Sequence, residues 1–435
     1  MVQELETPVP PTWWMAPYAG AIAVMLPLLT AAWLAPVEFH RELGRMVKYM
    51  NFGLYTLALA GVFSFAFGAF LAAHTRPAAS ARAATQAATS PAVCRLLEAV
   101  TWVLFGITLA AYAIWFTPLF RDPSILVDVF AGRWSERDIR NTIGTIPGVT
   151  TLVQAQIPYV TLLALRWVYF AKDRPSRPEK LALTCILVLT VLRTVVWGER
   201  VAIIETLVPL ALVFLRKPRY PLLTALAPVF AVVGLFLFFA VFEYFRSWSA
   251  YYKFQYDSYW IFVLSRLSGY YITALDNGAG MIQGWNNFAA LNTAEWFWRF
   301  PWEIGQTFLG KALGLDLTSD ESWLYWNASV EFNNASGIFM PFIDYGKAGG
   351  LVFWFLFGWL TGMIYRGFTA GSFAGMLIYP SWFVGVLEMP RILYLSEPRY
   401  FPVLAICLVL IFLVQSLTSQ EIRANPLRRS PRAQG

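Results

Sequence analysis

Charged side chains stand at the edges of long apolar runs in this sequence, where a charge is costly to keep out of water. Glu199 and Arg200 separate two apolar runs, Arg246 ends another, and Arg266 opens the stretch 266–271. Arginine presents a rigid fork of donors that fits phosphate oxygens, and it stays charged at any pH. The three arginines therefore suit a diphosphate group held at a membrane boundary, with Glu199 orienting Arg200. The alternatives are a hydrophilic turn at 199–200, a snorkelling Arg246 and a surface helix face around Arg266.

A carboxylate and an amine lie three residues apart at the start of a later apolar run. Asp344 and Lys347 would share one face of a helix at this spacing. A lone carboxylate in a membrane helix is a candidate for function, and a private Asp344–Lys347 ion pair is the alternative. The glycines at 346, 349, 350, 358 and 362 permit close approach of backbones, and we interpret them as packing positions rather than chemistry.

Other motifs do not support a nucleotide or metal site. The stretch 305–312 resembles a phosphate-binding loop, but Ala312 replaces the hydroxyl that would bind Mg²⁺, and no strand precedes it. The three cysteines are far apart in the chain, and the two histidines, His40 and His74, flank one apolar run at opposite ends. The acids beside His40 are interpreted as part of a solvated turn. We expect no metal and no cofactor.

The composition places these residues in a bilayer. The chain has 435 residues, of which 58% are hydrophobic and 14% charged, and its mean hydropathy is +0.53. Soluble domains carry about 25% charged residues. A soluble enzyme, a fibrous protein and a disordered chain are therefore excluded. The first apolar run follows no Lys/Arg-rich start, so we expect a retained helix rather than a cleaved signal.

Apolar runs long enough to cross a membrane predict an all-α polytopic protein with about ten transmembrane helices. The runs are residues 17–36, 52–73, 100–120, 149–170, 181–196, 201–215, 222–245, 337–365, 368–387 and 401–417. The fifth and sixth runs are nearly continuous and predict a tight hairpin broken at 197–200. We expect residues 1–435 to form a single membrane domain.

Basic residues predict the orientation of these helices. The segments 74–98, 172–180 and 216–219, Arg366 and the tail 419–435 are basic, and alternation along ten helices puts them on one side. The positive-inside rule makes that side cytoplasmic, with both termini and the basic tail there. Arginine is also frequent on the opposite side, which runs against the positive-inside bias. An anionic lipid substrate bound there is one explanation for these arginines. The long loop 246–336 lies there; its many aromatic residues predict two or three short helices on the membrane surface.

Several of these features together resemble one family. They are the Gly198-Glu199-Arg200 turn, Arg246 ahead of a long aromatic loop, Arg266 with Gly269-Tyr270-Tyr271, and the stretch 334–350 leading to Gly358. They look like the Wzy-type oligosaccharide repeat-unit polymerases of O-antigen and exopolysaccharide synthesis. The resemblance covers residues 180–370, while the first 170 residues match only in being hydrophobic. An Arg-x10-Gly spacing described for the family fits Arg299…Gly310 but not Arg200, Arg246 or Arg266. This departure leaves open which arginines align.

The resemblance implies a metal-independent glycosyltransferase of the bacterial inner membrane. Its substrate would be an undecaprenyl-diphosphate-linked oligosaccharide, joined on the periplasmic face with a flippase and a chain-length regulator as partners and with no nucleic acid. The arginines would neutralise the leaving diphosphate, and Asp344, or else Glu331 or Glu199, would take the proton from the acceptor hydroxyl. Residues expected to bind substrate are Arg299, Lys347, Tyr270, Tyr271 and Trp326. The alternatives are an O-antigen-type ligase and a transporter or flippase of lipid-linked sugars.

Overall fold

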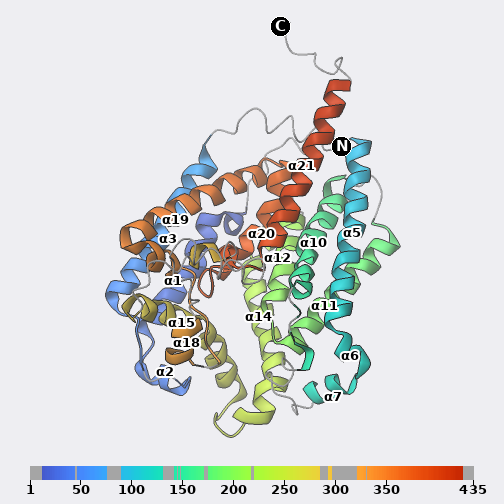
Figure 1. The fold of residues 1–435 in the computed structure, drawn as a ribbon. Helices are drawn as coiled ribbons and strands as arrows, with labels where there is room; N and C mark the ends of the chain where they lie inside the picture. Colours follow the sequence, from blue (N-terminus) through green and yellow to red (C-terminus); the bar gives the residue numbers. More distant parts are fainter. Residues whose placement is uncertain are drawn as a thin grey trace, which may run out of the picture.

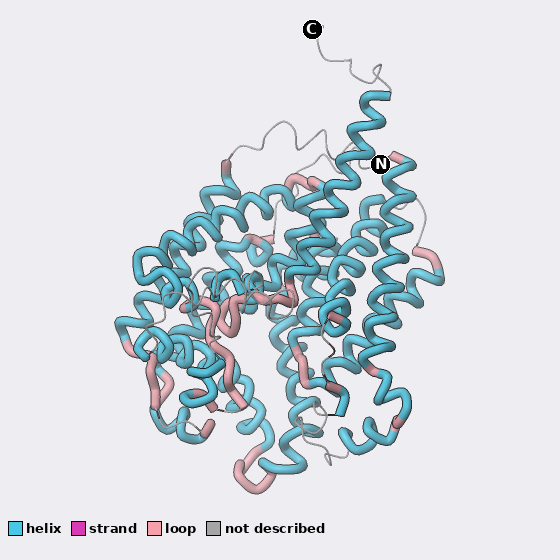
Figure 2. Tube along the Cα trace, in the orientation of Figure 1, coloured by secondary structure: helices cyan, strands magenta, loops and turns pink. Residues whose placement is uncertain are grey.

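The structure, a computed structural model, consists of helices joined by loops wherever it describes the chain. It describes residues 12–44, 47–75, 90–130, 142–144, 146, 148–170, 175–216, 220–284, 292–295, 321–329 and 331–424. Within these ranges there is no strand, and the one β contact is an isolated bridge between Ser329 and Phe332. Figure 2 shows helices joined by loops throughout this part of the chain. The predicted all-α class is confirmed for it.

Seven helices in the described ranges are long and apolar enough to cross a membrane. They are α1 (Pro17–Leu34), α3 (Phe52–His74), α5 (Pro91–Trp115), α11 (Arg177–Trp197), α14 (Ala227–Glu243) with its π-helical continuation Tyr244–Tyr252, α19 (Met340–Thr369) and α21 (Phe401–Ala424). The helix containing Arg246 therefore does not end at that residue, as the sequence predicted, but runs on to Tyr252. These lengths and compositions indicate a polytopic membrane protein.

The other three predicted spans are helical but shorter or interrupted. The helices α12 (Val201–Leu215) and α20 (Phe373–Glu388) have 15 and 16 residues, which at 1.5 Å per residue is less than the roughly 30 Å of a hydrocarbon core. Residues 149–170 divide into α9 (Val149–Leu152), a 3-10 turn (Val153–Ala155), α10 (Gln156–Leu165) and a π-helix (Arg166–Phe170). Every residue of α10 is buried. The number of ten spans stays a prediction.

Glycines bring α3 and α19 into close contact, and the two helices lie side by side in Figure 1. A Cβ atom at Gly358 would collide with the carbonyl oxygen of Phe65, and one at Gly362 with that of Ala69. On the facing helix, a Cβ at Gly68 would collide with the carbonyl oxygen of Phe355. The interpretation of Gly358 and Gly362 as packing positions is confirmed.

A kink interrupts α19 near its start. Gly346 has φ 69° and ψ −179°. This conformation lies outside the helical region, and its positive φ favours glycine. Because the break lies between them, Asp344 and Lys347 do not share one helix face. No ion pair joins these two described residues. The predicted shared face and its private ion pair are therefore wrong.

A long helix, α15 (Tyr259–Gly284), occupies the segment for which short surface helices were predicted. It has 26 residues, and its C-terminal half is buried. Asp276 on α15 accepts hydrogen bonds from the backbone N–H groups of Tyr49 (2.9 Å) and Met50 (2.7 Å). The expectation of short surface helices is wrong here, because polar groups inside α15 bind segments distant in the sequence. The short helix α18 (Glu321–Asn327) follows later, and residues 296–320 lie outside the described part of the loop.

The predicted solvated turn is confirmed for the acids Glu38 and Glu42, which are exposed, but not for His40. His40 lies in the short helix α2 (Val37–Glu42), is fully buried, and has its Nδ1 3.8 Å from Oδ2 of Asp276. The histidine thus faces α15 while the acids of α2 remain at the surface. The remaining short helices are α6 (Thr117–Arg121), α7 (Ser124–Phe130) and α13 (Pro221–Ala225).

Candidate functional site

Two of the predicted arginines meet at one buried carboxylate. Arg200, at the start of α12, and Arg266, on α15, both contact Glu243 at the end of α14. Arg200 Nη2 donates to Glu243 Oε1, and Arg266 Nε lies 3.4 Å from Glu243 Oε2. Glu243 is fully buried, so the two guanidinium groups replace the water that a carboxylate would otherwise need. Three helices thus place two arginines together.

Glu331 and Tyr252 complete this group on its exposed side. Arg266 Nη1 also donates to Glu331 Oε2. The Glu331 side chain is 47% exposed, whereas that of Arg266 is 4% exposed. The phenol of Tyr252 donates to the two carboxylate oxygens of Glu331, at 3.2 and 3.1 Å. We call Arg200, Glu243, Arg266, Glu331 and Tyr252 the Glu243 cluster.

Aromatic rings cover the guanidinium groups of the Glu243 cluster. Arg200 lies over the rings of Phe239 at 4.3 Å and Tyr270 at 4.6 Å. Arg266 lies over the ring of Phe332 at 4.8 Å. Such contacts stabilise a cation more as water is removed. The arginines are therefore held rigidly, by carboxylates and by rings on their faces.

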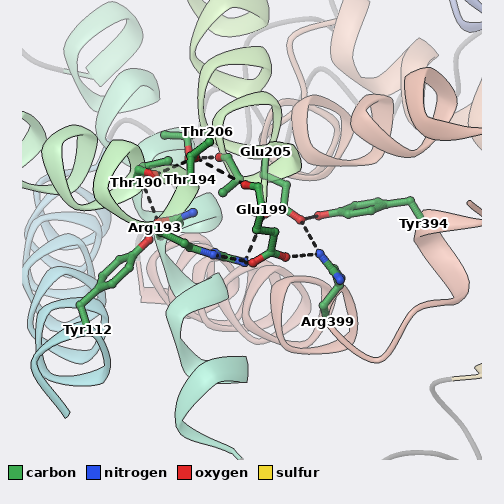
Figure 3. Close-up of polar contacts among 11 residues, drawn as sticks. Tyr112, Thr190, Arg193, Thr194, Glu199, Glu205, Thr206, Tyr394 and Arg399 are labelled. Carbon is green, nitrogen blue, oxygen red and sulfur yellow. Dashed lines mark hydrogen bonds and ion pairs between the residues drawn. The ribbon is translucent and has the colours of Figure 1, made fainter. Parts of the chain in front are cut away.

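A second ionic group, drawn in Figure 3, holds the turn just before Arg200. Arg193 and Arg399 approach Glu199 from opposite sides: Arg193 donates from Nε (2.8 Å) and Nη2 (2.6 Å) to Glu199 Oε2, and Arg399 Nη1 donates to Oε1. Glu205 on α12 is fully buried and accepts a 2.8 Å hydrogen bond from the hydroxyl of Tyr394. We call Arg193, Glu199, Glu205, Tyr394 and Arg399 the Glu199 cluster.

The arginines make Glu199 a strong acid. Burial alone would raise the pKa of this carboxyl group, but the charges and hydrogen bonds of Arg193 and Arg399 outweigh it and lower the pKa to about 2. A base with so low a pKa takes up a proton poorly at neutral pH. The geometry thus suits Glu199 to holding arginines rather than to removing a proton.

Asp344 lies apart from both clusters. Its Oδ1 accepts from Asn292 Nδ2 (2.9 Å), and its Oδ2 accepts from the backbone N–H (2.7 Å) and hydroxyl (2.8 Å) of Thr293. These bonds tie the short 3-10 helix Asn292–Ala294 to the kinked start of α19. Lys347, beyond the kink, is exposed.

The remaining predicted residues are dispersed. Tyr270 is part of the ring contact with Arg200. Burial, and then the charge of Glu388, raise the pKa of Tyr271 to about 12, with Arg391 and Arg200 acting in the opposite direction. Trp326 on α18 is 81% exposed. Arg246 lies in the π-helix, and Arg299 lies outside the described residues.

Sequence reasoning missed four charged members of the two clusters as site residues. Glu205 and Glu243 lie within or at the end of apolar helices, Arg193 lies in α11, and Arg399 precedes α21. An ionisable residue inside an apolar helix is itself a signal of function or of a buried partner. Applied to Glu205 and Glu243, that rule would have found them.

Among the residues that the structure describes, no group of three or more His, Cys, Asp or Glu side chains has the geometry to hold a metal ion. The arrangement instead offers fixed cations beside a half-exposed carboxylate. No protein-family model, curated protein or solved structure matches the chain.

Proposed function

We propose that this protein is a membrane glycosyltransferase that polymerises undecaprenyl-diphosphate-linked oligosaccharide repeats on the periplasmic face of the bacterial inner membrane. One observation carries the proposal: Arg200 and Arg266 converge on Glu243 beside the half-exposed Glu331. A pair of fixed guanidinium groups at a membrane protein's apolar boundary suits a substrate whose headgroup is a diphosphate. The proposal also rests on the resemblance to the repeat-unit polymerases.

In the proposed reaction the acceptor hydroxyl oxygen attacks the anomeric carbon of the growing chain. The bond from that carbon to the diphosphate oxygen breaks, and the lipid diphosphate leaves with the electron pair. Arg200 and Arg266, held in place by Glu243, stabilise the negative charge that develops there. The half-exposed carboxylate of Glu331 accepts the proton of the hydroxyl.

Glu331 is preferred as the base over the other two candidates. It touches Arg266 and remains half exposed, so a substrate hydroxyl has access to it. Glu199 is held between two arginines that lower its pKa. Asp344 uses both carboxylate oxygens to bind Asn292 and Thr293. Asp344→Asn should therefore reduce elongation less than Glu331→Gln does.

Purified protein in lipid nanodiscs tests the proposal directly. Given only a lipid-diphosphate oligosaccharide, it should yield a ladder of longer products without ATP, nucleotide sugar or added metal. Folded protein that elongates nothing under these conditions contradicts the proposal. Transfer of a single chain to an added lipid A-type acceptor, with no ladder, would identify a ligase instead.

A transporter of lipid-linked sugars is the second candidate. Transporters use broken helices and buried charges near the bilayer midplane, and this chain has the Gly346 kink in α19 and the Arg193–Glu205 pair, 4.0 Å apart, between α11 and α12. Movement of labelled lipid across a liposome bilayer, without elongation, would favour this candidate.

A further inference from the structure

The turn between α11 and α12 divides two adjacent residues between the two clusters. Glu199 belongs to the Glu199 cluster, and the next residue, Arg200, belongs to the Glu243 cluster. Gly198 allows this turn because its φ is 70°, in the left-handed region, where it ends α11. A displacement of Glu199 would therefore be transmitted directly to Arg200.

Glu199 is held from two directions by residues distant from each other in the sequence. Arg193 lies six residues earlier, near the end of α11, and is 2% exposed. Arg399 comes from the segment between α20 and α21, 200 residues away, and contacts the opposite carboxylate oxygen. The hydroxyl of Thr194 adds a 3.4 Å hydrogen bond to the carbonyl oxygen of Glu199.

The same two arginines also face Glu205. Arg193 Nη2 is 4.0 Å from Glu205 Oε2, and Arg399 Nη1 is 3.9 Å from Glu205 Oε1. Two guanidinium groups thus alternate with two carboxyl groups across α11, α12 and the 389–400 segment. Interactions within such a buried network strengthen one another.

We propose that Arg193 and Arg399 are positioning residues: by holding Glu199 they fix the backbone of the 198–200 turn, and so fix Arg200 against Glu243 and Tyr270. Among the described residues, no ion pair joins the 389–400 segment to Glu243 or Arg266. Through Arg399, this segment nevertheless determines the geometry of the Glu243 cluster. The effect on elongation rests on the proposed function; the effect on the turn does not.

Amide hydrogen exchange of the turn tests the structural claim without any activity. The measured peptide covers residues 198–203, in which the N–H of Ala202 bonds the carbonyl of Glu199 (3.2 Å) and that of Ile203 bonds the carbonyl of Arg200 (3.3 Å). Arg399→Gln should speed its exchange about tenfold or more, since a hydrogen bond to a charged group is lost. Arg391→Gln is the matched control, because Arg391 lies in the same segment but pairs with Glu388 at 3.6 Å. Exchange as slow in Arg399→Gln as in the control overturns the proposal.

Two further variants guard against misfolding. If Arg399→Gln is not recovered from membranes, Glu199→Gln removes the same ion pairs without deleting a cation and should give the same faster exchange. Arg399→Lys keeps the charge and should restore part of the protection. Loss of protection across all helices in every variant would mean that the arginines support the whole fold, which also overturns the positioning role.

A double-mutant cycle connects the turn with elongation. Arg399→Gln should lower the elongation rate at least tenfold in the wild-type background and have little further effect in Arg200→Ala, because its action passes through Arg200. Equal losses in both backgrounds would contradict the proposal. If the wild-type protein elongates nothing while the exchange result holds, the proposed function has failed and the positioning of Arg200 stands.

Discussion

Arg266 contacts two carboxylates in very different surroundings, and this contrast defines its expected behaviour. Glu243 is fully buried and has Arg200 as its second partner, whereas Glu331 is half exposed. Losing Arg266 removes a transition-state donor and also leaves Glu243 with one cation. We therefore expect Arg266→Ala to lower the elongation rate by about 10²–10³ and to reduce stability, by about 3–5 kcal/mol if the buried pair is broken.

Arg266→Lys separates these two effects. Lysine keeps the positive charge beside Glu243 but lacks the fork that serves two carboxylates at once. Membrane abundance should be close to wild type, while the elongation rate stays well below it. Full elongation by both variants at normal abundance would place the site elsewhere in the molecule.

Glu199 predicts a loss of stability in acid. Its pKa falls from an ordinary 4.5 to about 2 on folding, so the folded state favours the ionised form. The stabilisation is fully present above pH 4.5 and is lost as the pH falls from there towards 2. Melting temperatures in detergent, measured from pH 7 to pH 3, should fall more steeply for wild type than for Glu199→Gln. Parallel curves would show that Glu199 is not held as an ion pair.

The arginines of the site could be found from the sequence, but the pairing with their carboxylates could not. Arg200 and Arg266 stand out because each interrupts or follows an apolar run. Their meeting depends on Glu243, whose place at the end of an apolar helix marks it as unusual but does not say which arginines it contacts. Arg399 and Glu199 are 200 residues apart, and no local pattern reports a contact at that separation. The choice of Asp344 as a candidate base stays a prediction, and the kink at Gly346 that separates it from Lys347 could not be predicted from the local pattern.

At the scale of elements, apolar length predicted most helices well and failed for α15. Each of the ten apolar runs is mostly helical in the structure, because hydrocarbon or a packed interior favours backbone hydrogen bonds made within the segment. The helix α15 carries Asp276 and Asn277 in its buried half. Those polar residues made the segment look like a loop, although Asp276 accepts from distant backbone N–H groups and Asn277 Nδ2 donates to distant backbone carbonyls.

The same Gly→Ala substitution should have opposite effects on stability at a glycine inside the α3–α19 contact and at one in α5 that faces open space. Gly358→Ala places a methyl group against the Phe65 carbonyl, and α19 must move away from α3, so we expect destabilisation of about 1–3 kcal/mol or more. A methyl group at Gly106 in α5 would have no neighbouring atom of the described chain within 4 Å, so Gly106→Ala should stabilise its helix slightly, by about 0.5–1 kcal/mol. Thermal denaturation of both variants in one detergent checks this. A tolerated Gly358→Ala would contradict the close packing.

At the scale of the whole molecule, the ends of the helices fall into two groups. In Figure 1 the C-terminal ends of α3 and α21 and the start of α5 lie at one end of the bundle, and α2, α6, α7 and α18 lie toward the other. The first of these ends is the one that we expect to face the cytoplasm, because the basic segment 74–98 and the basic tail adjoin it.

Cysteine labelling decides the orientation. In a variant whose Cys94, Cys185 and Cys407 are replaced by Ala, cysteines are introduced singly at two exposed positions, Pro178 and Asn327. Neither change removes a basic residue or the Ser176 cap of α11. An impermeant thiol reagent added to spheroplasts should label position 327 and spare position 178. The reverse pattern would invert the topology and place the Glu243 cluster on the cytoplasmic side, against our proposal.

The hydrogen bonds of Asp276 set a time scale for the protein's synthesis. The backbone N–H groups of Tyr49 and Met50 precede α3, and their acceptor is 227 and 226 residues further along the chain. At about 5–20 residues per second, roughly 10 to 45 seconds pass before that acceptor leaves the ribosome. During this interval the N–H groups of Tyr49 and Met50 lack this acceptor, so the segment that leads into α3 reaches its final hydrogen bonding only after α15 has been made.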